Sequence, residues 1–223
     1  MAVDPKNRVC YMTEDAGSGS RFYRWVPDEG DWPTAEVRPK FENGTLQVCE
    51  IVGLENGGYV ENEDLDRLRD VNPITWSDCI DPHRPQGDVR GENSDAPGTR
   101  FPGNEGIWYY ELPEDQRQVP QSGQTQTAGL IFFTSKGDNR VYAIDVENQL
   151  IEVILDNDNG QISPGMSDVD NLTVSPWGDI LVAEDLVGAR TDIRIIIAVP
   201  NQPAIPLVIA NHSGSEICGP AFS

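Results

Sequence analysis

Acidic and amide side chains stand at both outer ends of a predicted β-hairpin between residues 170 and 185. Two β-branched runs flank a turn at 176–179, which is the pattern of a hairpin. In a hairpin, the start of the first strand lies beside the end of the second. Four oxygen-bearing side chains are therefore expected to share one rim, namely Asp170, Asn171, Glu184 and Asp185.

Acidic residues recur at comparable places beside other predicted strands. Glu14 and Asp15 follow a strand, turn and strand near the N-terminus, and Glu105 and Glu216 each precede a strand. The spacing is 46 residues from Asp170 to Glu216 and 65 residues from Glu105 to Asp170, the longer one containing a polar insert at 113–127. Periods of roughly 40 to 50 residues with several strands are typical of propeller blades. A propeller sets equivalent strand ends around one channel, so these acids are expected to face one another.

Carboxylates that converge on one cavity predict a bound cation. They repel one another, and either a cation or a captured proton relieves that repulsion. Calcium accepts six to eight oxygen ligands, which fits this set better than a zinc site does. A single acid after a strand often only begins a loop, but repetition at matching positions favours the metal. The candidate ligands are Glu14, Glu105, Asp170, Asn171, Glu184, Asp185 and Glu216.

Composition limits the partners of the chain. The 223 residues include 37 acidic and 16 basic ones, for a formal net charge of −21. Nucleic acid and anionic lipid would be repelled by that charge, although much of it also serves solubility in loops. No apolar run reaches the roughly 20 residues of a membrane span, and no signal peptide precedes Met1. We expect a soluble monomer.

The distribution of strands predicts an all-β fold, a β-propeller of several four-stranded blades around a central channel. Residues 1–223 are expected to form one domain with an irregular insert at about 56–100, which holds a short helix at 62–70. Both ends of the chain interrupt a repeat, so the propeller is expected to be incomplete and the chain a fragment. Strands are predicted at 9–13, 21–26, 45–52, 107–111, 129–134, 140–144, 150–155, 172–175, 180–183, 193–199 and 206–210.

Two basic residues flank a predicted turn. Lys136 and Arg140 bracket the Gly-Asp-Asn run at 137–139, where they could meet an anion. An ordinary hairpin turn is the alternative.

Taken together, several motifs resemble the PhoX-type alkaline phosphatase family. Their order matches over nearly the whole chain outside the insert. The motifs are Thr-Glu14-Asp15, Glu105-Gly-Ile-Trp-Tyr, Phe133-Thr-Ser-Lys-Gly-Asp-Asn-Arg, Asp170-Asn-Leu-Thr-Val-Ser-Pro and Glu216-Ile-Cys-Gly-Pro-Ala-Phe-Ser.

The resemblance implies a propeller whose channel holds a calcium and iron cluster and which hydrolyses small phosphate monoesters. It places Glu14, Glu105, Asp170, Glu184 and Glu216 toward the metals, with Glu105 and Asp170 as catalytic groups. Lys136 and Arg140 become candidate substrate contacts. Members of the family are typically exported, which implies a periplasmic or extracellular protein.

The chain departs from the family pattern in two ways. It lacks the upstream cysteine strand and the His-Glu segment, and it has Gly103 where members often carry an arginine. That arginine would be a bidentate clamp for an anion. Two alternatives therefore stay open: a calcium-dependent lactonase of the gluconolactonase type, and a calcium-stabilised propeller without catalysis.

Overall fold

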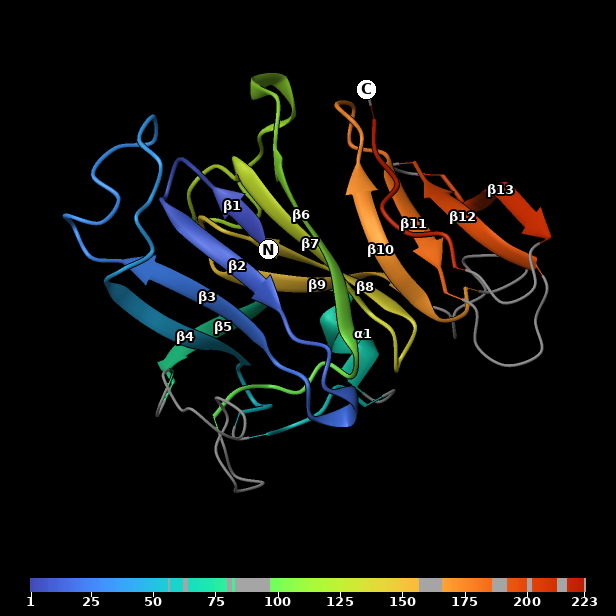
Figure 1. Cartoon of the computed structure of the whole chain (residues 1–223), viewed down its shortest axis with the longest axis horizontal. Coiled ribbons are helices and arrows are strands. Elements are labelled where there is room, and N and C mark those ends of the chain that lie inside the picture. The colour runs from blue at the N-terminus through green and yellow to red at the C-terminus, as the bar shows by residue number, and fades with distance from the viewer. Residues whose placement is uncertain are drawn as a thin grey trace.

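Strands make up most of the regular structure of this protein. The computed structural model describes residues 1–55, 57–61, 64–79, 82, 97–156, 166–185, 192–199, 202–211 and 216–222. Its helices are single short turns: η1 (Gly17–Gly19), α1 (Leu65–Leu68) and η3 (Glu114–Gln116). None of the described helices has the length and apolarity to cross a lipid bilayer. The predicted all-β class is confirmed (Figure 1).

Nine strands form one sheet whose two ends approach each other. The order across the sheet is β1-β2-β3-β4-β5-β9-β8-β7-β6. The two end strands, β1 and β6, are in contact, so the sheet is nearly closed. The strands are β1 (Ala2–Asp4), β2 (Val9–Thr13), β3 (Phe22–Pro27), β4 (Gly44–Ile51), β5 (Asn72–Asp78), β6 (Asn104–Glu111), β7 (Gly129–Ser135), β8 (Arg140–Asp145) and β9 (Leu150–Asp156).

A second sheet of four strands packs beside the first. Its strands follow one another in sequence and in space: β10 (Val169–Val174), β11 (Ile180–Glu184), β12 (Asp192–Ala198) and β13 (Ile205–Asn211). Strand β10 contacts β6 and β7 of the first sheet, and Figure 1 shows it beside β6. The predicted hairpin of β10 and β11 is confirmed, with Val169 opposite Glu184.

The two sheets contain antiparallel meanders of the kind that form propeller blades. Strands β6–β9 and β10–β13 are each a four-stranded antiparallel meander, as a blade is. Their first strands lie side by side, and β6 also contacts β2 of the N-terminal meander. A short pairing of β5 with β9 joins two of these meanders at their last strands into the nine-stranded sheet.

Strand β7 is apolar up to Phe133 because both of its faces are buried. Alternate side chains of a strand point to opposite faces. Ile131 and Phe133 therefore enter the core enclosed by the nine-stranded sheet, where Phe133 stacks on Phe22 and Tyr142. Phe132 points the other way, into the core shared with the second sheet. Packing on both faces fixes β6 and β7 against β10.

The predicted strands are all present, and one more lies in the predicted insert. Strand β5 pairs with β4 over Ile74–Asp78 and with β9 at Pro73. Because proline lacks an N–H donor and is depleted in sheets, the sequence pattern there suggested irregular chain. The predicted short helix is confirmed as the single turn of α1.

Candidate metal centre

Two β-bulges set the geometry at the start of β6 and β10. The pairing register shifts between Asn104 and Ile107 in β6 and between Val169 and Leu172 in β10. A bulge bends the strand and redirects its side chains. The strands also approach closely at Gly106, where a Cβ atom would lie 2.5 Å from the backbone nitrogen of Leu172. Only glycine fits at that crossing.

Two threonine hydroxyls connect strands at this crossing: Thr134 connects β6 with β10, and Thr13 connects β2 with β6. The Thr134 hydroxyl accepts a hydrogen bond from the Gly106 N–H at 2.8 Å and donates one to the Asp170 carbonyl. The Thr13 hydroxyl donates to the Glu105 carbonyl at 2.6 Å. The backbones that carry Glu105 and Asp170 are thereby held in fixed positions relative to each other.

The ammonium group of Lys136, directly after β7, lies among three carboxylates. Its Nζ is 2.5 Å from Asp185 Oδ2, 3.4 Å from Glu105 Oε1 and 3.5 Å from Asp170 Oδ2. Partial burial disfavours the charged ammonium, but the hydrogen bond to Asp185 and the surrounding negative charge outweigh it. The pKa of Lys136 is raised as a result.

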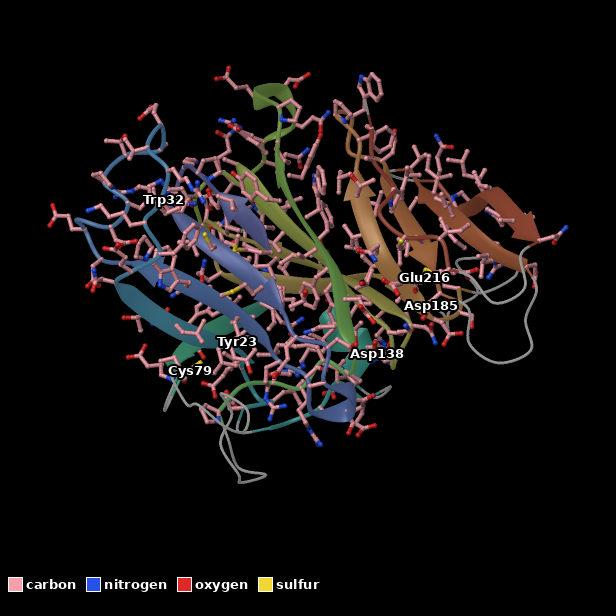
Figure 2. All side chains as sticks on the ribbon, in the orientation of Figure 1. Tyr23, Trp32, Cys79, Asp138, Asp185 and Glu216 are labelled. Atoms are coloured by element: carbon pink, nitrogen blue, oxygen red, sulfur yellow. The ribbon has the colours of Figure 1, made fainter. Side chains whose placement is uncertain are left out.

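A fourth carboxylate, Glu216, joins this group from the C-terminal segment. Asp170, Asp185 and Glu216 each offer an oxygen atom, and these atoms all lie within 4.8 Å of one another. Figure 2 shows Asp185 and Glu216 next to each other. We call Glu105, Asp170, Asp185, Glu216 and Lys136 the Lys136 cluster.

The negative charge of the Lys136 cluster exceeds its positive charge. Burial first, and then the charge of Asp185, raise the pKa of Asp170 against the opposing effect of Lys136. The charges of Asp185 and Asp170 raise the pKa of Glu216. Such mutual repulsion is what a divalent cation relieves, and the donors are the hard oxygen ligands that calcium prefers. The residues present therefore fit a calcium site.

Of the Glu14-Asp15 pair, Asp15 is the residue that acts on the Lys136 cluster. Burial, followed by the charges of Asp170 and Asp15, raises the pKa of Glu105. Glu14 instead accepts hydrogen bonds from the Tyr23 hydroxyl and the Arg21 N–H, both at 3.1 Å. In Figure 2, Tyr23 lies well apart from Asp185 and Glu216. The strand pattern located the pair but did not tell which member faces the cluster.

The two members of the Glu184-Asp185 pair also have different partners. Glu184 is fully buried and accepts hydrogen bonds from Arg194 Nε at 2.7 Å and from a second guanidinium nitrogen at 2.5 Å. The Ser167 N–H also donates to it at 2.9 Å. Because consecutive residues at a strand end point to opposite faces, Glu184 is directed to Arg194 while Asp185 reaches Lys136.

Of the two remaining predicted residues, Asn171 lies next to the Lys136 cluster and Arg140 lies away from it. Asn171 donates its side-chain amide to Asp170 Oδ1 at 2.6 Å and so orients that carboxylate. Arg140 is 2% exposed and lies beside Asp138 at 3.2 Å and Asp156 at 3.5 Å, where it also donates to the Val60 carbonyl. Arg140 therefore faces a buried network and not the cluster.

Asn104, the residue before Glu105, was not among the predicted site residues. Its side chain is 1% exposed, and neither amide atom has a hydrogen-bond partner among the residues that the structure describes. Buried polar groups are nearly always satisfied by protein, water or an ion. Its place directly before the conspicuous Glu105-Gly106 pair was the only sequence signal for it.

A cleft of about 570 Å³ opens beside Lys136. Gly103, which has a φ of +58°, lies in its wall, and a Cβ atom there would be 3.3 Å from Lys136 Cβ. The lining residues are Asp15, Gly17, Ser18, Tyr59, Glu61, Arg100, Pro102, Gly103, Lys136 and Gly137. Asp15 and Lys136 connect this cleft to the carboxylates of the cluster.

The family model described as Alkaline phosphatase PhoX matches residues 1–223, which is the whole chain. No curated protein matches the chain.

Proposed function

Because this chain belongs to the PhoX family of alkaline phosphatases, we propose that its Lys136 cluster binds calcium and hydrolyses small phosphate monoesters there. The observation that carries the proposal is the convergence of Asp170, Asp185 and Glu216, whose oxygen atoms lie within 4.8 Å of one another. No observation favours the lactonase or the scaffold without catalysis.

The acids of the cluster would hold the metal ions. Asp170, Asp185 and Glu216 provide the convergent oxygens, and Glu105 lies across Lys136 from them. Calcium, with iron as the second metal that the family resemblance implies, would supply the positive charge that polarises a phosphoryl group. Asn171 would keep the Asp170 carboxylate in its ligating orientation through their 2.6 Å hydrogen bond.

Lys136 would exchange partners when the site is loaded. Its ammonium now balances Glu105, Asp170 and Asp185, and it also lines the cleft. Cations on the carboxylates would take over that balance. The ammonium would then be able to donate hydrogen bonds to an anionic phosphoryl oxygen that enters through the cleft.

The site of action is proposed from the family. Its members are usually exported, so we propose that this protein acts outside the cytoplasm, in a compartment where calcium is plentiful.

Hydrolysis of p-nitrophenyl phosphate before and after chelation tests the proposal. We expect activity with calcium, alone or with iron, and its loss in EDTA. Asp170→Asn should lower kcat/KM about 100-fold, because it removes a charged ligand at the reacting centre. Asp115→Asn is the matched control, since Asp115 is an exposed acid of η3. Metal analysis of protein purified without chelator gives the identity of the bound ions.

Two outcomes would contradict the proposal. One is hydrolysis that persists in EDTA and in Asp170→Asn. The other is cleavage of sugar lactones, insensitive to phosphate and vanadate, with no cleavage of phosphate esters.

A further inference from the structure

Arg100 lies in the wall of the cleft without an acidic partner. Its guanidinium carbon is 5.7 Å from the centre of the Tyr59 ring, and its backbone N–H donates to the Gly58 carbonyl at 2.8 Å. No carboxylate of the described residues forms a salt bridge with it, and its buried Nε has no acceptor among them. This is notable in a chain with 37 acidic and 16 basic residues.

The other basic residue that lines the cleft is already engaged. Lys136 is within 3.5 Å of three carboxylates. Among the described residues, the half-buried guanidinium of Arg100 contacts the Tyr59 ring and forms no ion pair, and Gly103, which has no side chain, lies in the same wall. A guanidinium in this position can donate two parallel hydrogen bonds to one anion, which an ammonium cannot.

We propose that Arg100 binds the phosphoryl group of the substrate from the cleft wall and selects dianionic monoesters over monoanionic diesters. The inference rests on the proposed function, because the cleft leads to the Lys136 cluster through Asp15 and Lys136. A monoester presents a pair of charged nonbridging oxygens to the planar guanidinium while its third oxygen faces the cluster. A diester has only two nonbridging oxygens and one negative charge. It therefore cannot bind the guanidinium with two oxygens and still present a third to the cluster.

Binding of inorganic phosphate to the calcium-loaded protein, measured by isothermal titration calorimetry, tests the role of Arg100 without turnover. We expect Arg100→Gln to weaken phosphate binding roughly 10- to 100-fold, the loss typical of a charge-assisted pair of hydrogen bonds. Arg100→Lys should recover only part of the affinity. Arg38→Gln is the control, because Arg38 is an exposed arginine in the loop between β3 and β4, which Figure 1 shows far from η1.

A second measurement addresses selectivity. The ratio of kcat/KM for p-nitrophenyl phosphate to that for bis(p-nitrophenyl) phosphate should fall at least tenfold in Arg100→Gln. Thermal unfolding followed by circular dichroism verifies that each variant folds.

Each result bears on one proposal or the other. Phosphate affinity unchanged in a folded Arg100→Gln, or absent in the calcium-loaded parent protein, overturns the role of Arg100. An inactive parent protein that binds phosphate through Arg100 contradicts the proposed phosphatase function and leaves the anion site standing.

Discussion

Two groups of charged side chains near the ends of the strands differ in how their charges balance. In the first, Arg140 lies beside Asp138 and Asp156, and Arg69 approaches Asp156 at 3.5 Å. Asp138 and Asp156 are 5% and 1% exposed, so the carboxylates of this network are buried. The Lys136 cluster has four carboxylates for a single ammonium, and a cleft connects it with solvent.

Acids that are paired within the fold differ in charge balance from the acids of the proposed metal site. Paired buried charges satisfy one another, and removal of one partner leaves the other uncompensated. Glu184 with Arg194 is a further balanced pair. Surplus carboxylates cost free energy until a cation arrives, and such a cost is typical of binding sites. Charge balance, and not the presence of acids, separates the two groups.

The largest expected effect comes from breaking a balanced pair. Arg194→Met should lower the free energy of unfolding by about 3–5 kcal/mol, because it removes the guanidinium that compensates the buried charge of Glu184. Urea denaturation measures it. The control is Arg117→Met, whose partner Glu111 is 61% exposed, and which should cost about 0–1 kcal/mol. Equal losses in the two variants would refute the distinction between buried pair and surface pair.

The next effect distinguishes two neighbouring acids by their response to calcium. At a calcium concentration about 100 times Kd, the free energy of unfolding should rise by about 2.7 kcal/mol. Asp185→Asn should remove most of this increment, because Asp185 belongs to the convergent oxygens. Glu184→Gln should destabilise the protein yet keep the increment, because Glu184 is bound to Arg194.

Calcium titrations followed by urea denaturation compare the two variants directly. The same increment in both would show that calcium binds elsewhere. Loss of the increment only in Glu184→Gln would show that calcium binds at Glu184, on the opposite face of β11.

Much of the fold was predictable because strands bury alternating side chains. Period-2 patterns and turn residues located the strands of all the meanders except β5, where Pro73 masked the pattern. The hairpin of β10 and β11 followed from its Pro-Trp-Gly-Asp turn. Local sequence thus specified the hairpins, since their contacts lie between adjacent strands.

The orientation of individual acids could not be predicted in the same way. The bulges before Ile107 and Leu172 change which face each side chain occupies, and a shift of one residue reverses that face. Of the expected ligands Glu184 and Asp185, Asp185 contacts Lys136 while Glu184 is bound to Arg194. Asp15, the neighbour of the expected ligand Glu14, adds its charge to the cluster. Arg100 and Lys136 meet only through folding, because 36 positions separate them in sequence.

The smallest expected effect is the pH dependence of stability in the metal-free protein. The pKa values of Glu105, Asp170 and Glu216 are raised, so the folded state binds more protons than the unfolded state above the ordinary carboxyl range. Stability should therefore fall as pH rises through that window, and the urea midpoint in EDTA should be higher near pH 5 than near pH 7.5.

The high net negative charge of the whole chain also lowers stability as pH rises. A variant is therefore needed to isolate the contribution of the Lys136 cluster. Asp170→Asn should show a shallower slope, because it removes one raised carboxyl and lessens the repulsion on Glu216. Its midpoint should exceed that of the parent protein near pH 7.5 and converge with it at acid pH. The difference should shrink in high salt, since Glu216 is exposed and its repulsion by Asp170 is screened. Parallel curves for the two proteins would mean that the surplus charge of the Lys136 cluster carries no cost, and the contrast with the Arg140 network would then fail.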